Sequence, residues 1–141
     1  MTSLARFNDP KVKLNVTVIG AGNLAHVFAG LLGARNTEFT VRILSRKANA
    51  IAENMVNNGV KVKIASKDEG KESFVVGKVA AVSSNPKDVI PQADLIIITV
   101  PSHGRPETMK AIAPHIAKNR IVYCGVMPGM GRHSKPSHYL F

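Results

Sequence analysis

The stretch TVIGAGNLAHVFAG, residues 17–30, carries the strongest indication of the fold of this chain. It passes from an apolar run through Gly20 and Gly22 into a segment with the apolar spacing of a helix. Residues 20–25, GAGNLA, match Gly-x-Gly-x-x-Ala, the turn that joins the first strand of a dinucleotide-binding unit to its first helix. In such a turn the first glycine permits the bend, the second lets the backbone approach a pyrophosphate, and a small third residue lets helix and strand pack closely.

The residues on both sides of this turn meet the structural condition that the motif needs. Residues 16–19 are a β-branched run typical of a buried strand, and residues 23–32 carry apolar side chains three or four positions apart. The predicted buried helix face consists of Leu24, Val27, Phe28 and Leu31, and Gly33 is placed to end the helix. We therefore predict a loop whose helix N-terminus binds phosphate, with a purely structural turn as the alternative. The predicted cofactor-binding residues of this loop are Gly20, Ala21, Gly22, Asn23, Leu24 and Ala25.

The alternation of strand and helix continues along the chain. Apolar runs at residues 39–44, 95–100 and 121–125 are predicted strands, and residues 105–117 are a predicted helix. Residues 60–65 alternate apolar and basic side chains and begin a small antiparallel excursion. Short links between alternating strands and helices indicate parallel strands joined by right-handed crossovers. The sequence therefore predicts an α/β fold, a three-layer Rossmann-like domain with a mainly parallel sheet.

We expect one domain, at residues 13–131, and no second domain within the 141 residues. Residues 1–12 lack the apolar stretch of a secretory signal and are expected to be a flexible tail. Residues 132–141 carry no periodic pattern and are expected to be a second tail. No apolar run reaches the roughly 18–20 residues that a membrane span needs.

The second predicted strand ends in a polar, basic turn, Leu44-Ser45-Arg46-Lys47. A site that prefers NAD commonly has an acidic residue here, which hydrogen-bonds the adenosine ribose, and no acid is present. Ser45, Arg46 and Lys47 instead offer a hydroxyl, a guanidinium and an ammonium group, which suit a 2′-phosphate. NADP(H) is therefore favoured over NAD(H), with an ordinary basic helix start as the alternative.

The loop VPSHG, residues 100–104, follows the most apolar predicted strand. Ligands of open α/β sheets bind beyond the carboxyl ends of the strands, so we expect Val100, Pro101 and Ser102 beside the nicotinamide half of the cofactor. His103 is either a proton donor at this mouth or a solvated loop residue, and the second interpretation is favoured. We assign no catalytic residue and find no metal-ligand spacing.

Charge and cysteine content leave two classes of partner open. The formal net charge is +10, and the basic residues are spread along the chain without a nucleic-acid-binding motif. This charge suits an anionic small molecule as well as a nucleic acid. Cys124 is the one cysteine, so an intramolecular disulfide is excluded and a reducing compartment, the cytoplasm, is expected. Within the run IVYC, Cys124 is expected to be a core residue.

Four segments together resemble the N-terminal NAD(P)-binding domain of the octopine/opine dehydrogenases, within the wider group of glycerol-3-phosphate and ketopantoate reductase-like enzymes. They are GAGNLAHVFAGLL, VRILSR, ADLIIITVPSHG and VMPGMG, and the resemblance covers about residues 13–131. It implies NAD(P)H-dependent reductive condensation of a 2-oxo acid with the amino group of an amino acid. It also implies a pyrophosphate loop of Gly20, Gly22, Asn23 and Ala25, and a nicotinamide side of Val100 and Pro101.

In that family the amino-acid site and the acid–base machinery belong largely to a second, helical domain. We therefore expect this chain to bind the dinucleotide but to show little or no turnover by itself. Its other partners would be an anionic 2-oxo acid and an amino acid once a second domain is supplied; no membrane partner is expected, and a homo-oligomer stays open. Two alternatives remain: a stand-alone NADP(H)-binding or sensing module that acts through a partner, and, less favoured, a basic nucleic-acid-binding protein.

Overall fold

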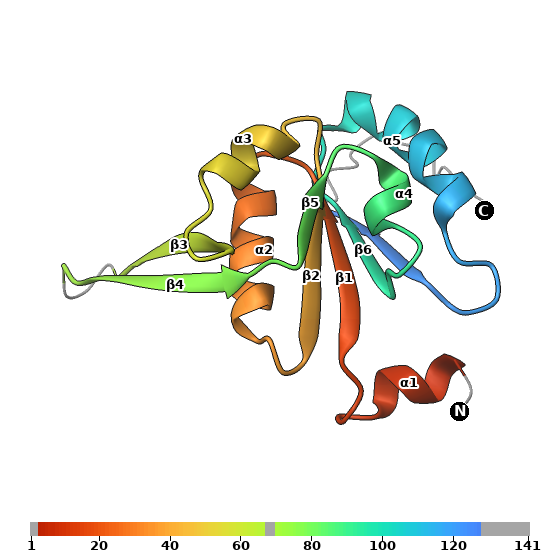
Figure 1. The fold of residues 1–141 in the computed structure, drawn as a ribbon, viewed down its shortest axis with the longest axis horizontal. Coiled ribbons are helices and arrows are strands. Elements are labelled where there is room, and N and C mark those ends of the chain that lie inside the picture. Colours follow the sequence, from red (N-terminus) through yellow and green to blue (C-terminus); the bar gives the residue numbers. More distant parts are fainter. Residues whose placement is uncertain (1–2, 67–69, 128–141) are drawn as a thin grey trace.

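Parallel strands form the centre of the structure, a computed structural model that describes residues 3–66 and 70–127 (Figure 1). In spatial order the sheet contains β5 (Ala81–Ser83), β2 (Phe39–Leu44), β1 (Leu14–Ile19), β6 (Leu95–Ile98) and β7 (Tyr123–Val126). β1 lies in the middle and pairs with β2 on one side and β6 on the other. The outer pairs, β2 with β5 and β6 with β7, are parallel too, which confirms the predicted sheet.

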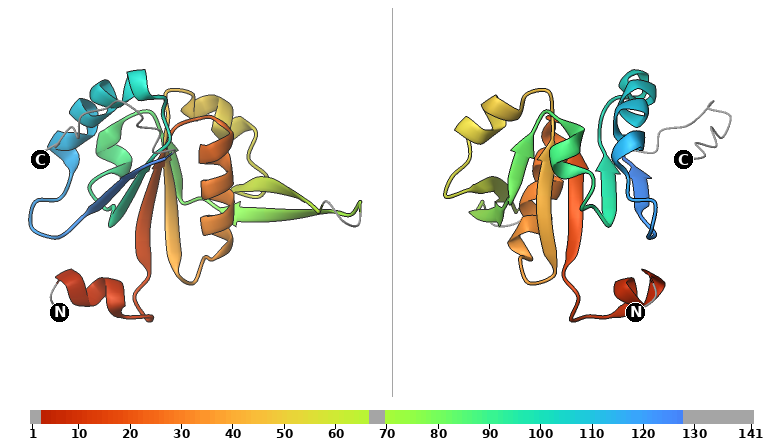
Figure 2. Two further views of the ribbon diagram at one scale, coloured as in Figure 1. Left: turned by 180° about the vertical axis from the view of Figure 1, so that it is seen from behind. Right: turned by 45° about the vertical axis from the view of Figure 1, so that its right-hand side comes forward.

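Helices cover both faces of this sheet. Helices α2 (Asn23–Ala34) and α3 (Ala48–Glu53) follow β1 and β2, whereas α4 (Pro86–Val89) and α5 (Arg105–Ile112) follow β5 and β6. Successive residues of a strand point to opposite faces, so Ile97 packs in the cluster that includes α2, while Ile96 and Ile98 pack in the cluster of α4 and α5. Both layers are visible in Figure 2. The predicted three-layer Rossmann-like architecture is confirmed.

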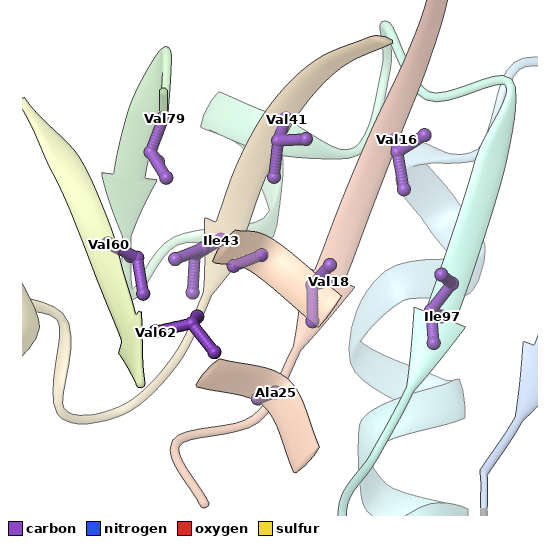
Figure 3. Packing of buried hydrophobic residues seen from close by; sticks show 10 residues of the cluster. Val16, Val18, Ala25, Val41, Ile43, Val60, Val62, Val79 and Ile97 are labelled. Carbon is purple, nitrogen blue, oxygen red and sulfur yellow. The ribbon is translucent and has the colours of Figure 1, made fainter. Parts of the chain in front are cut away.

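Helix α2 contacts the sheet through small residues. Ala25 and Ala29 are 3% and 0% exposed, and Figure 3 shows Ala25 in the cluster with the strand valines. The prediction of a large apolar buried face is wrong for most of its members, because Leu24, Val27 and Leu31 are 36%, 37% and 43% exposed. The apolar residues of this segment do have helical spacing. A spacing of three and four residues does not identify which face of the helix packs on the sheet.

Two further strands form an antiparallel hairpin, β3 (Gly59–Ala65) and β4 (Glu72–Lys78), which confirms the predicted excursion. The hairpin packs on α2 at glycines: a Cβ on Gly30 would lie 2.1 Å from Val62, and one on Gly33 would lie 2.5 Å from the carbonyl oxygen of Lys78. Gly33 thus lies inside α2 rather than ending it, because the hairpin needs the space of its missing side chain. The His26 ring adds a polar link, with Nε2 2.6 Å from the carbonyl oxygen of Lys61.

Residues 3–8 form helix α1 (Ser3–Asn8), so the prediction of a flexible tail over residues 1–12 is wrong for this part. Arg6 donates to the carboxylate of Asp94 over 3.1 Å, and the Phe7 ring meets the ring of Tyr123 edge-on with 4.8 Å between centroids. Asp94 and Tyr123 lie far from α1 in the sequence, so no local sequence pattern predicts that this helix forms. The predicted tail at residues 132–141 lies outside the described residues.

Strand β7 is an outer strand, and it corrects the prediction for Cys124. Cys124 is exposed rather than a core residue, because within the described chain β7 pairs with β6 alone. Desolvation by neighbouring atoms nevertheless raises the pKa of its thiol above the ordinary value. Short 3-10 turns, Ser102–Gly104 and Ala113–His115, flank α5. Over residues 3–66 and 70–127, no helix combines the length and apolar character that crossing a membrane would require.

Candidate functional site

A cleft of about 670 Å³ opens at the carboxyl ends of the parallel strands. The loops that follow β1, β2, β5 and β6 form its walls, together with one side of α5. β1 lies between β2 and β6, so the connections that leave β1 and β6 diverge to opposite faces of the sheet. Such a switch point is where open α/β sheets bind ligands. The fold therefore brings the predicted loops together around one site.

Gly20 directly follows β1, and the surrounding protein accounts for its backbone conformation. Its φ is +140°, which side chains rarely tolerate, and a Cβ would lie 2.2 Å from Oγ1 of Thr99. The Thr99 hydroxyl donates to the carbonyl oxygen of Ile19 over 2.8 Å, and the Gly20 amide donates to the carbonyl oxygen of Leu44 over 3.0 Å. These bonds hold the turn against its neighbours on both sides. The first glycine of the motif is thus explained by the fold alone.

Gly22 differs from Gly20, because neither its backbone conformation nor a close contact in the described protein requires a glycine at this position. Its φ of −83° suits any residue, and a Cβ there would meet no atom within 4 Å. It is the N-cap of α2, and no side chain of the described residues caps the N-terminus of this helix. Uncapped backbone N–H groups and the positive end of the helix dipole favour an anion. Gly22 lines the cleft, so the space beside it is open to a ligand.

The turn after β2 contributes positive charge to the cleft. Ser45 is 6% exposed, and its hydroxyl oxygen accepts a hydrogen bond from the Lys47 amide over 3.1 Å, which leaves its proton available to a ligand. The side chains of Arg46 and Lys47 are exposed, and both residues line the cleft. The Ser45 amide donates to the carbonyl oxygen of Ser83 over 3.0 Å, which ties the turn to β5. A rigid turn thus presents two cations.

The wall after β6 is neutral except for one carboxylate. Thr99, Val100 and Pro101 line it, followed by Gly104 and the first turns of α5. The Thr108 hydroxyl donates to the carbonyl oxygen of Gly104 over 2.9 Å and holds the start of α5 to the loop. Glu107 is exposed at that start and lines the cleft. The described residues that line this wall offer van der Waals surface, hydroxyl groups and one carboxylate acceptor. Arg105 does not line the cleft, and its Nε donates to the carbonyl oxygen of Val100 over 3.2 Å.

The cleft contains most of the residues that the sequence pointed to. It brings together Gly20, Ala21, Gly22, Ser45, Arg46, Lys47, Val100 and Pro101, and it does not include Asn23, Leu24, Ala25 and Ser102. Ala25 is buried beneath the loop, as the packing role of the third motif residue requires. His103 is exposed and does not line the cleft.

Sequence reasoning missed several lining residues, chiefly Ser84, Thr99, Glu107 and Thr108. Thr99 follows β6 directly, so its place at the end of a buried parallel strand was a usable signal. Ser84 follows the short strand β5, which the sequence did not separate from the hairpin. Glu107 and Thr108 lie in a helix, and only the approach of α5 to the loop after β1 brings them to the site.

Comparison with known proteins gives the family. The sequence profile of the family "Ketopantoate reductase PanE/ApbA" matches residues 16–138. The chain belongs to this family. Opine dehydrogenase of Haliotis discus hannai is 32% identical over 123 residues, which cover 83% of this chain and 29% of that protein. Tauropine dehydrogenase of Arabella iricolor is 30% identical, with 76% of this chain and 27% of that protein covered. The chain thus spans less than a third of the length of these relatives.

Solved structures agree with this assignment. Octopine dehydrogenase, in a structure with NADH and L-arginine, superposes with a TM-score of 0.70 at 26% identity, covering 79% of this chain and 28% of that one. A PanE/ApbA family ketopantoate reductase from Ralstonia eutropha JMP134 gives 0.52 at 25% identity, covering 77% of this chain and 33% of that one. The resemblance to the N-terminal domain of opine dehydrogenases is confirmed. None of these names supports the nucleic-acid-binding alternative.

Proposed function

We propose that this chain is the cofactor-binding domain of an opine-dehydrogenase-like oxidoreductase and that it prefers NADP(H) to NAD(H). The observation that carries the proposal is the open space at Gly22, at the uncapped N-terminus of α2 inside the cleft. A pyrophosphate in that space would accept hydrogen bonds from the backbone N–H groups of the turn. Membership of the PanE/ApbA family supports the same class of ligand.

Each wall of the cleft would hold one part of the cofactor. Gly20, Ala21 and Gly22 would surround the pyrophosphate, with Asn23 and Leu24 supplying amides of the first helical turn and Ala25 keeping α2 close to β1. Arg46 and Lys47 would pair with a 2′-phosphate, to which the Ser45 hydroxyl would donate. Val100, Pro101 and Ser102 would lie along the nicotinamide half. The bound cofactor supplies the hydride chemistry, and these residues bind and orient it.

The proposed reaction is the reductive condensation of a 2-oxo acid with the amino group of an amino acid. Such a reaction needs both substrates held beside the nicotinamide, with water excluded and a proton donor in place. Among the described residues that line the cleft there is no histidine, and the titratable groups are Arg46, Lys47 and Glu107. We therefore expect binding with little or no turnover from this chain alone. Brisk NADPH oxidation by the purified chain with pyruvate and an amino acid would contradict this.

Residues 13–131 are our proposed cofactor-binding unit, with α1 as an N-terminal addition that packs on it. A single cysteine and an exposed thiol are compatible with a reducing environment, and we place the protein in the cytoplasm.

Thermal unfolding with each of NADPH, NADP⁺, NADH and NAD⁺ tests the proposal. A ligand that binds only the folded state raises Tm, so we expect stabilisation by dinucleotides and a larger shift with the phosphorylated pair. Arg46→Ala should lower the affinity for NADPH about tenfold and leave that for NADH nearly unchanged, because the lost interaction is with the 2′-phosphate. Isothermal titration calorimetry measures both.

Lys13→Ala is the matched control, since Lys13 is exposed just before β1, at the opposite edge of the sheet, and its loss changes the net charge equally. It should leave both affinities unchanged. If no dinucleotide raises Tm, the proposed function is wrong. If dinucleotides bind but Arg46→Ala keeps the preference, only the choice of NADP(H) is wrong.

A further inference from the structure

Among the described residues that line the cleft, Glu107 is the one that carries a carboxylate. It stands in the first turn of α5, directly after the loop that follows β6. Over residues 3–66 and 70–127 no hydrogen bond or ion pair engages its carboxylate, and the side chain is exposed. A carboxylate repels phosphate groups, so its presence in a cleft that otherwise suits a polyanion indicates a separate role for this side chain.

The order of the strands separates this carboxylate from the cations of the site. Arg46 and Lys47 follow β2, the glycine loop follows β1, and Glu107 lies beyond β6. Because β2 and β6 pair with opposite sides of β1, the charges along the cleft run from basic through the helix N-terminus to acidic. A dinucleotide laid along this edge has its adenosine phosphate at the basic end and its second nucleoside at the acidic end.

Nearby hydroxyl groups are already used by the protein. Thr99 donates to the carbonyl oxygen of Ile19 and Thr108 to that of Gly104, so neither hydroxyl proton is free for a ligand in this arrangement. Glu107 offers a charged acceptor without a protein donor. The ligand groups that match such an acceptor are the vicinal hydroxyls of a ribose, which donate strong charge-assisted hydrogen bonds to a carboxylate.

We propose that Glu107 binds the ribose hydroxyls of the nicotinamide half of the cofactor and so orients the nicotinamide ring in the cleft. This rests on the proposed function and adds a residue that the motif does not contain. The competing role is purely structural: an acid in the first turn of a helix stabilises it through the helix dipole. The two roles differ in what they predict, because a dipole role does not depend on which half of a ligand is bound.

The ligand-binding role and the structural role of Glu107 can be distinguished by comparing the whole cofactor with its adenine half. The 141-residue chain, with Glu107→Ala and Glu107→Gln variants, is titrated by calorimetry with NADPH and with 2′,5′-ADP, which lacks the nicotinamide half. We expect Glu107→Ala to weaken NADPH binding about tenfold and to change 2′,5′-ADP binding less than twofold. Glu107→Gln keeps an acceptor oxygen without the charge, so its loss should be intermediate. If the wild type prefers NADH, the pair becomes NADH and ADP.

Glu53→Ala is the matched control, because Glu53 is exposed at the end of α3 and does not line the cleft. Unchanged NADPH binding in both Glu107 variants would overturn the proposal, as would an equal loss for the whole cofactor and its adenine half. If Glu107→Ala lowers the Tm of the free chain, the Gln variant decides, since its half-ligand difference must still be present. Failure of the wild type to bind either ligand would instead refute the proposed function.

Discussion

Polar groups at the carboxyl ends and at the amino ends of the parallel strands differ in whether the protein itself supplies their hydrogen-bond partners. At the carboxyl edge, the N-terminus of α2 has no side-chain cap, and two cations and a carboxylate stand exposed around the cleft. At the amino edge, Asp94 is 1% exposed and accepts hydrogen bonds from the Arg6 and Arg120 side chains and from the Asn15 amide. One edge keeps its hydrogen-bonding capacity for a ligand, and the other uses it to hold the fold.

This difference has a physical basis. A buried carboxylate is tolerable only when donors surround it, and Asp94 has donors from α1, from β1 and from the segment before β7. It therefore joins elements that are distant in the sequence. Unsatisfied groups at the carboxyl edge face the solvent instead, where water can bind them until a ligand replaces it. We therefore expect substitutions at the amino edge to change stability and those at the carboxyl edge to change binding.

The largest effect should follow Asp94→Ala. Removing the carboxylate leaves the guanidinium groups of Arg6 and Arg120 without their buried partner, and we expect a loss of about 3 kcal/mol in the free energy of unfolding. Urea titration measures it, with Glu53→Ala as an exposed acidic control that should stay within about 0.5 kcal/mol. A loss below about 1 kcal/mol would show that the amino edge does not hold the fold as described.

Gly20→Ala should affect both properties. The φ of +140° and the contact with Thr99 make the new methyl group costly, and we expect about 2 kcal/mol of lost stability with loss of cofactor binding. Adding Thr99→Ala removes the clash but leaves the backbone strain, so the double variant should recover part of the stability. Full recovery in chemical denaturation would mean that the backbone conformation carries no strain.

Gly22→Ala sharpens the contrast, because it should affect binding alone. The backbone conformation suits alanine and the new Cβ meets no protein atom, so the free energy of unfolding should change by less than about 0.5 kcal/mol. The methyl group would occupy the space that we assign to the pyrophosphate, and we expect at least a tenfold loss of dinucleotide affinity, about 1.4 kcal/mol. Calorimetry that finds unchanged affinity would remove the main support for the phosphate site.

The smallest expected effect is on the alkylation rate of Cys124, which lies on the outer strand β7. Desolvation raises the pKa of its thiol, so at pH 8 it holds less thiolate than an unperturbed cysteine, although the residue is exposed. Alkylation by iodoacetamide should therefore be slower than that of a short cysteine peptide and should speed up at higher pH than the peptide. Equal rates across the pH series would contradict the raised pKa.

The parallel sheet and the glycine loop could be predicted from the amino-acid sequence alone. Both depend on residues that are neighbours in the chain: β-branched runs, a helical spacing, and a Gly-x-Gly between them. The basic turn at residues 45–47 was predictable for the same reason, since it follows directly on a strand whose carboxyl end must lie at the ligand edge.

The three-dimensional packing was needed to show which surfaces are buried and which distant residues are in contact. Periodicity shows that α2 is amphipathic, yet the stripe that packs is the one with Ala25 and Ala29, because the sheet and hairpin require close approach. Arg6 and Asp94 are 88 residues apart, and no pattern in either segment predicts their contact. Glu107 reaches the cleft only because α5 and the glycine loop line it from different parts of the chain. The spacing of apolar residues along the chain specifies helices and strands. The burial of their side chains and the contacts between distant residues depend on how those helices and strands pack together.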